Sequence, residues 1–253
     1  MKVLGILGSQ ARHGITGQLL QTVLDNVAPG VETETIFLED YQIHPVAVQE
    51  HNDLAFLVKK LAESDVWIWA APTYWRTING ILKKFLDCLR PELVYTKANG
   101  DTIPGQFKNK HYLSITDCYV SSFENFVAGI TDETFKAIDR VMTAAGVIRI
   151  GEIVCPGTLH LQQLPASKVK LCQRYGQKIS HRPRKDDSTL KRYLQLFCMI
   201  GLMSFLTMVI QQGLHSLWSI SNFWFNYGSF VIIFCALLFA LLHFVTFWKH
   251  RRR

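Results

Sequence analysis

The sequence of 253 residues contains no pair of cysteines with CxxC spacing and no Cys/His cluster with the spacing of a zinc site. Its six cysteines are scattered singly, at positions 88, 118, 155, 172, 198 and 235. Isolated cysteines are typical of buried thiols in a reducing compartment. We therefore predict no metal ligands and expect the thiols to be structural.

The first 170 residues also lack any basic run interleaved with aromatic residues, although the net charge is +7. Much of the basic excess lies instead between residues 174 and 192 and in the last five positions, on either side of an apolar segment. This distribution excludes a nucleic-acid partner. At the N-terminus, the apolar run 3–7 is too short for a signal peptide, so we expect none there.

Charged residues are missing altogether from residues 193–248, which contain no Asp, Glu, Lys or Arg. A helix needs roughly 20 apolar residues to cross a bilayer. Two such helices fit, one over about residues 193–212 and one over about 227–248, with turn residues and interfacial tryptophans between them. The alternative, a buried hairpin of a larger soluble domain, is disfavoured because such helices normally keep one polar face.

The flanking basic residues predict the orientation and the division of the chain. Because cytoplasmic flanks carry the excess of Lys and Arg, both ends of the hairpin are expected in the cytoplasm, with membrane lipid as a partner. The chain then divides into a domain over residues 1–180, a basic linker over 181–192, a transmembrane hairpin over 193–248 and a basic tail over 249–253.

The first 180 residues alternate between apolar strands and amphipathic helices. Strands are predicted over 2–7, 32–38, 66–71, 111–116 and 147–155, and helices begin near 16, 52, 80, 133 and 166. Uninterrupted apolar strands in such alternation indicate a parallel sheet covered by helices on both faces. We predict an α/β, doubly wound, five-stranded sheet with the flavodoxin-like order 2-1-3-4-5.

In a sheet of this order, ligands bind beyond the carboxyl ends of the strands, where the order reverses. The first loop at this edge, residues 8–16, begins with Gly8-Ser9 and ends at Thr16, where a helix starts. Hydroxyl groups, glycines and a helix N-terminus suit a phosphate, and Arg12 and His13 add positive charge. The alternative is an ordinary strand-to-helix turn, and no Walker motif is present.

The second loop contains two neighbouring aromatic residues, Tyr74 and Trp75, directly after Pro72 and Thr73. Exposed aromatic rings at this edge suit stacking on a flat ligand. The alternative places the pair in the core or in a homodimer interface. The third loop, residues 116–122, is polar with one aromatic residue, and Asp117 is interpreted as a turn residue rather than an acid–base group.

Three segments resemble the NAD(P)H-dependent FMN reductases and the related flavodoxin-fold quinone reductases: KVLGILGSQARHGIT, VWIWAAPTYWRTINGILKKFLDCL and AAGVIRIGEIVCPGT. The resemblance covers about residues 1–180. It implies FMN as the cofactor and NAD(P)H as the co-substrate. It also implies that the first loop binds the FMN phosphate while the other two loops flank the isoalloxazine ring. The residues so implied are Ser9, Gln10, Arg12, Thr16, Pro72, Thr73, Tyr74, Trp75, Thr116, Asp117 and Tyr119.

The chain departs from this family in the first loop. The family often has Pro-Arg where this chain has Gln10-Ala11, and Asn where it has Ile15, so Arg12 becomes the candidate compensating cation. Iron–sulfur relatives carry a cysteine cluster in the region that corresponds to residues 43–52. Since this chain has no cysteine there, we expect no iron–sulfur cluster.

The sequence thus predicts a membrane-anchored NAD(P)H oxidoreductase in which the flavin carries out the chemistry and no side chain is catalytic. Its electron acceptor is an unidentified small molecule, and proximity to a membrane makes a quinone one candidate. Two alternatives stay open at this stage. One is a flavodoxin-like electron carrier, and the other is a membrane interaction protein with a decayed flavin site.

Overall fold

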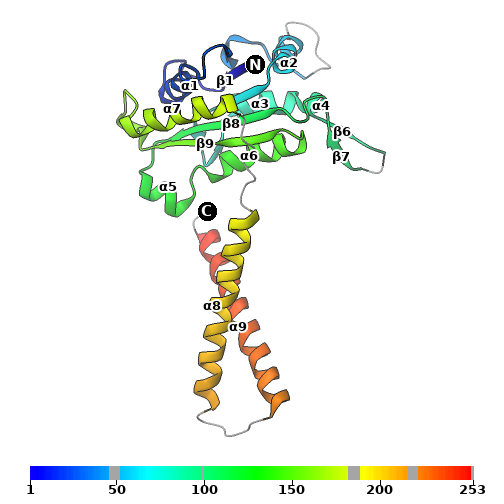
Figure 1. Cartoon of the computed structure of the whole chain (residues 1–253), viewed down its shortest axis with the longest axis vertical. Coiled ribbons are helices and arrows are strands. Elements are labelled where there is room, and N and C mark those ends of the chain that lie inside the picture. Colours follow the sequence, from blue (N-terminus) through cyan, green and yellow to red (C-terminus); the bar gives the residue numbers. More distant parts are fainter. Residues whose placement is uncertain (46–51, 99, 182–188, 216–221, 252–253) are drawn as a thin grey trace. The chain divides into compact units, whose positions relative to one another are not determined.

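The computed structural model describes residues 1–45, 52–98, 100–181, 189–215 and 222–251 (Figure 1). The chain forms two compact units, Met1–Lys185 and Asp186–Arg253, each of which is described by itself. Most of the predicted basic linker, residues 182–188, lies outside the described residues.

A five-stranded parallel sheet forms the centre of the first unit (Figure 1). Its strands, in their spatial order, are β2 (Glu32–Phe37), β1 (Lys2–Leu7), β3 (Val66–Ala70), β8 (His111–Cys118) and β9 (Ile148–Pro156). In chain order this is 2-1-3-4-5, which confirms the prediction for this unit. The order therefore reverses between β1 and β3, and the edge beyond their carboxyl ends is the expected ligand edge.

Each face of the sheet has its own hydrophobic core. The helices α1 (Ile15–Leu24) and α7 (Ala166–His181) pack on one face, where Val66, Ile68 and Ala70 are buried. The helices α2 (Leu54–Glu63), α3 (Gly80–Cys88) and α6 (Asp132–Ala144) pack on the other, where Trp67 and Trp69 are buried. Side chains of β3 alternate between the two cores, as expected for a central strand.

Several short elements were not predicted by the sequence. They are the hairpin β4–β5 (Thr73–Tyr74 and Thr77–Ile78), α4 (Arg90–Leu93), the hairpin β6–β7 (Val94–Thr96 and Thr102–Pro104), α5 (Ser122–Ala128), and the 3-10 turns η1 (Leu38–Asp40) and η2 (Thr158–His160). Figure 1 shows β6–β7 extending away from the sheet. These elements are too short to produce a period that can be recognised in the sequence, and three of them (β4–β5, α5 and η2) belong to loops at the ligand edge.

Two glycines allow backbone segments to approach α1 closely. A Cβ at Gly17, in the first turn of α1, would lie 2.1 Å from the carbonyl oxygen of Arg12. A Cβ at Gly176, in α7, would lie 2.6 Å from the carbonyl oxygen of Val23 near the end of α1. Helix α1 is therefore in close backbone contact with the first loop at one end and with α7 at the other.

The second unit consists of α8 (Thr189–His215) and α9 (Phe223–Arg251), which cover both predicted spans. The Gln211 side chain on α8 donates hydrogen bonds to the Asn226 carbonyl and to Ser229 Oγ on α9, both over 2.7 Å. By length and composition, one helix in the described residues can cross a membrane, through Phe223–Ala240 with mean hydropathy 1.9. The apolar stretch Phe197–Gly213 of α8 is shorter, and residues 216–221 of the predicted connection lie outside the described residues.

Candidate functional site

A pocket of about 510 Å³ opens at the carboxyl edge of the sheet, beside the ends of β3 and β8. Its volume lies within the range of about 300–1,000 Å³ that is usual for small-molecule sites. Of the predicted residues, it is lined by Pro72, Thr73, Tyr74, Trp75, Asp117 and Tyr119. It is also lined by Arg76, Cys118, Val120, Glu124, Ile130 and Thr158. The second and third loops therefore meet where the prediction placed them.

The aromatic loop is a tight hairpin turn with an unusual backbone. Trp75 and Arg76 connect β4 to β5, and both have positive φ, 52° and 66°. Positive φ at both central residues of a two-residue hairpin favours Gly, Asn or Asp, so Trp and Arg are strained here. The Arg76 guanidinium donates to the carbonyl of Ala128, which ties the turn to α5. The Trp75 side chain is 98% exposed.

The hydroxyl groups of two predicted threonines, Thr73 and Thr116, are hydrogen-bonded to each other. Thr73 Oγ1 lies 2.8 Å from Thr116 Oγ1 and 2.8 Å from Thr134 Oγ1, and all three residues are buried. This cluster fixes the start of the second loop to β8 and α6. Thr116 lies within β8 rather than in a loop, and it does not line the pocket.

Hydrogen bonds within the first loop and from Asn79, at the start of α3, fix the position of this loop. Ser9 is buried, and its Oγ accepts a hydrogen bond from the amide of Ala11 at 3.2 Å. Asn79 caps α3 by accepting from the Leu82 amide at 3.0 Å, while its amide group donates to the Gly8 carbonyl. The N-cap of α1 is Gly14, which has no side chain to accept from the first-turn amides. These amides suit an anionic group.

Thr16, in the first turn of α1, donates a hydrogen bond to Asp117 Oδ1, and Thr158 Oγ1 lies 3.3 Å from Asp117 Oδ2. The interpretation of Asp117 as a turn residue was wrong, because β8 extends two residues further than predicted and Asp117 lies within it. The carboxyl is almost fully buried, and this burial raises the pKa of Asp117 although both hydroxyls oppose the shift. Asp117 joins the first loop to the pocket.

The other two predicted residues of the first loop, Gln10 and Arg12, are exposed. The Arg12 guanidinium forms an ion pair with Asp40 and lies 4.5 Å from the centre of the Phe37 ring. Its charge is therefore directed toward the end of β2. The structure shows no contact between Arg12 and the hydroxyls of Ser9 or Thr16.

Large apolar side chains are exposed on the elements that border the pocket. They are Tyr74, Trp75, Tyr119, Phe123, Phe126, Val127 and Leu159. Phe123 and Phe126 belong to α5, which has no buried residue, and are 77% and 87% exposed. We call this set the apolar rim. Clusters of exposed apolar residues at a pocket mark a surface that contacts apolar molecules.

The pocket contains one thiol, that of Cys118. Burial raises the pKa of Cys118 to about 11, so the thiol is protonated at neutral pH and is a poor nucleophile. In the part of the chain that the structure describes, no group of three or more His, Cys, Asp or Glu residues is arranged to hold a metal ion. The site therefore offers binding groups rather than a reactive side chain.

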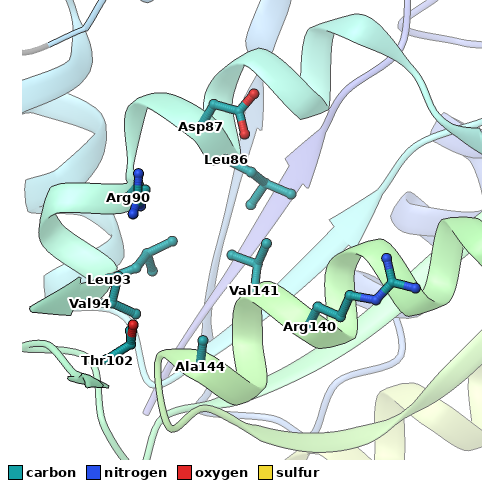
Figure 2. A pocket seen from close by; sticks show the side chains of 9 residues that line it. All are labelled: Leu86, Asp87, Arg90, Leu93, Val94, Thr102, Arg140, Val141 and Ala144. Atoms are coloured by element: carbon teal, nitrogen blue, oxygen red, sulfur yellow. The ribbon is translucent and has the colours of Figure 1, made fainter. Parts of the chain in front are cut away.

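A second pocket, of about 260 Å³, lies between α3, α4 and α6 (Figure 2). In Figure 2, Leu86 and Val141 point toward one another across it, and Leu93, Val94 and Ala144 complete its apolar lining. None of the predicted residues lines this pocket. It also lies away from the ends of β1 and β3, so we assign the candidate site to the larger pocket.

Three of the unpredicted residues that line the larger pocket come from outside the three predicted loops. Glu124 and Ile130 come from α5 and the residues after it, and Thr158 comes from η2 after β9. The contribution of Thr158 was accessible in principle. Strand β9 is parallel to β8, so the loop that follows it ends at the same edge of the sheet.

Residues 1–115 match the family model of the NADPH-dependent FMN reductases. The match covers β1, the first loop, β3, the aromatic loop and most of β8, and so contains most of the predicted site. This result supports the resemblance on which the site residues were assigned.

Two curated relatives are iron–sulfur flavoproteins. That of Methanocaldococcus jannaschii is 33% identical over 102 residues, which are 36% of this chain and 53% of the relative. That of Archaeoglobus fulgidus is 23% identical over 212 residues, 77% of this chain and 89% of the relative. The chain thus spans about half the length of the first relative and most of the second.

Solved structures show the same fold. The NAD(P)H:quinone oxidoreductase of Methanothermobacter marburgensis superimposes with a TM-score of 0.57 at 12% identity, over 72% of this chain and 98% of that one. At this identity the likeness establishes the fold alone. The first unit therefore has a flavodoxin-like fold.

Proposed function

We propose that this chain is an FMN-dependent oxidoreductase that takes hydride from NADH or NADPH and passes electrons to a small-molecule acceptor. The observation that carries the proposal is the pocket of about 510 Å³ at the point where the strand order reverses, lined by the aromatic loop and by Asp117. The family match over residues 1–115 supports the same activity, and the names of the two curated relatives support a flavin cofactor.

The residues present fit FMN in two regions. The pocket beside Tyr74, Trp75 and Tyr119 suits the flat ring, because aromatic side chains stack on such rings. The first loop, with the hydroxyls of Ser9 and Thr16 and the uncapped first turn of α1, suits the phosphate. Bound FMN would supply the redox chemistry, and the chain would position it.

An accessible ring face is needed for hydride transfer from a nicotinamide. Trp75 is almost fully exposed and therefore is not packed down over the floor of the pocket. Its strained turn is fixed from the other side by the bond from Arg76 to Ala128. This arrangement favours a reductase over an electron carrier whose flavin is covered.

Anaerobic mixing of the FMN-loaded full chain with NADH or NADPH tests the proposal. Bleaching of the flavin absorbance within seconds by either nucleotide supports the reductase. An absence of bleaching with both, while dithionite reduces the flavin normally, would instead assign the chain to the electron carriers. If the full chain did not bind FMN, the remaining hypothesis would be a membrane interaction protein with a decayed flavin site.

The acceptor that fits the apolar rim is a flat, apolar molecule of the quinone class. The rim includes Trp75, which lines the pocket, and Phe123 and Phe126 on α5, and their exposed surfaces suit an apolar ring. The double substitution of Phe123 and Phe126 by serine should slow reduction of a quinone and leave reduction of ferricyanide unchanged. Equal rates of quinone reduction by wild type and by the double variant would exclude Phe123 and Phe126 from binding the acceptor. The homodimer stays a prediction.

We further propose that the second unit anchors the chain in a membrane through two spans, with both termini in the cytoplasm. Helix α9 is long and apolar enough to span, α8 is apolar over Phe197–Gly213, and residues 193–248 carry no Asp, Glu, Lys or Arg. A reporter inserted at Ser219 should face away from the cytoplasm, while one at the C-terminus should face it. Reporters on the same side would exclude two spans.

A further inference from the structure

The Asp117 carboxyl occupies a position that connects the pocket to the first loop. Its oxygens are hydrogen-bonded by Thr16, from the first turn of α1, and by Thr158, from η2. Only 9% of the residue is exposed, and Asp117 forms no ion pair among the residues that the structure describes. A buried carboxylate without a cation is costly, which is why burial raises the pKa of Asp117.

The hydrogen bond from Thr16 conflicts with the role of this residue as a phosphate ligand. A threonine hydroxyl has a single proton to donate, and an ionised carboxylate can only accept. While Asp117 is ionised, the Thr16 proton is directed at the carboxylate and is not available to a phosphate oxygen. Two negative charges would also face each other across a poorly solvated space, where their repulsion is strong.

Protonation of Asp117 removes both obstacles. The protonated carboxyl has an O–H group that can donate to Thr16 Oγ1, so the bond between the two residues reverses its direction. The proton of Thr16 then becomes available to the phosphate, and the charge on Asp117 is gone.

We propose that Asp117 must be protonated for the phosphate of FMN to bind at Thr16, so that Asp117 makes recognition of the phosphate dependent on pH. The inference rests on the proposed function and extends it, because it identifies the residue that sets the preference for a phosphorylated flavin. Asp117 is a specificity residue in this scheme, since it acts through Thr16.

The titratable groups that interact with the carboxyl are Cys118 on β8 and Cys155 on β9, and Glu124 on α5 lines the same pocket. His13 and His160 lie in the segments that supply Thr16 and Thr158. Burial raises the pKa of both thiols, which are therefore neutral over the useful range of pH. The two histidines are exposed, and their substitution by glutamine provides controls for a titration near neutral pH.

The test is the affinity of the detergent-purified full chain for FMN and for riboflavin, measured by quenching of flavin fluorescence between pH 5 and pH 8. Riboflavin has the same ring without the phosphate. The variant Asp117→Asn keeps the shape of the side chain and carries an amide that donates to Thr16, as the protonated acid would. The phosphate of FMN titrates near pH 6 by itself, so wild type and variant are compared at each pH.

We expect Asp117→Asn to bind FMN at least tenfold more tightly than wild type at pH 8, with a smaller difference at pH 5, and to change the affinity for riboflavin less than the affinity for FMN. As the pH rises, the ratio of FMN affinity to riboflavin affinity should fall in wild type at least tenfold more than it does in Asp117→Asn. The variants His13→Gln and His160→Gln should show the same fall as wild type. The inference would be overturned if the FMN affinities of Asp117→Asn and wild type differed by less than twofold at all pH values. It would also be overturned if the substitution changed riboflavin affinity as much as FMN affinity. Absence of binding of either flavin by both proteins would overturn the proposed function itself.

Discussion

The Thr16 hydroxyl donates a hydrogen bond to the carboxyl of Asp117, a residue 101 positions further along the chain. This bond connects the first turn of α1 to the end of β8. It therefore brings together the region proposed for the phosphate and the pocket proposed for the ring.

The stability of the domain should depend on pH through Asp117. Its pKa is raised in the folded state, so the folded protein binds this proton more tightly than the unfolded chain does. The contribution of the group is therefore most favourable below the unfolded pKa of about 3.9 and declines as the pH rises through the raised folded pKa. We expect Asp117→Asn to match wild type near pH 4 and to be more stable at pH 7 in urea unfolding. Equal stability at both pH values would contradict this.

Removal of the two hydroxyls of the first loop should weaken FMN binding. Each hydrogen bond contributes about 0.5–1.5 kcal/mol, and more to a charged group. At acidic pH, where protonated Asp117 leaves the Thr16 proton available, the double variant Ser9→Ala and Thr16→Ala should lose at least about tenfold in FMN affinity, which corresponds to about 1.4 kcal/mol, and should keep its riboflavin affinity. Fluorescence titration measures both. An unchanged FMN affinity would mean that the backbone amides of α1 bind the phosphate without the hydroxyls.

Gly17→Ala should displace the first loop, because the new Cβ would lie 2.1 Å from the Arg12 carbonyl oxygen. Overpacking against backbone costs about 1–3 kcal/mol, and we expect this loss in urea unfolding together with weaker FMN binding. Gly80→Ala is the matched control, since no heavy atom lies within 4 Å of a Cβ there and Gly80 begins α3. If both variants behaved alike, the close approach at Gly17 would have no energetic role.

Trp75→Asn should stabilise the domain and impair reduction of the acceptor. Asn adopts positive φ more readily than Trp, so strain of about 1 kcal/mol at this turn position is relieved. The loss of the exposed ring should slow quinone reduction, measured in steady state, while Trp75→Tyr should retain most of the rate. A variant that is less stable than wild type would show that Trp75 makes contacts that offset its strain.

The full chain should resist extraction from membranes by carbonate or high salt, because residues 193–248 carry no Asp, Glu, Lys or Arg. A chain that ends after His181 should appear in the soluble fraction under the same conditions. Release of the full chain by salt would show that it is held by surface charge alone. Immunoblotting of pellet and supernatant distinguishes these results.

The sheet could be predicted from the sequence because its strands are continuous apolar runs separated by helical periodicity. Val66–Ala70, for example, is buried throughout, and its bounds were predicted to within one residue. The hairpin β4–β5 was not predicted, because Trp75 and Arg76 occupy positions where turn chemistry favours Gly or Asn. Its strands have two residues each, which is too short for an alternating pattern to appear.

The candidate site was predictable as a set of loops but not as a set of contacts. The order of the strands placed the loops at one edge, and the pocket lies there. Pairing within the site depends on tertiary distances that the sequence does not contain. The ion pair of Arg12 with Asp40 and the hydrogen bond between Thr73 and Thr116 are examples, and neither pairing follows from the sequence.

The close approach of α7 to α1 at Gly176 has a consequence for where the domain ends. Helix α7 contributes Cys172 and Ile179 to the same core as Leu19 and Leu20 of α1, so it is a wall of the domain rather than a connector. The first turn of α1, in turn, carries Thr16. The last helix of the first unit, α7, thus packs directly on the helix that carries Thr16. A truncation within α7 would therefore remove core side chains on which α1, and with it Thr16, is packed.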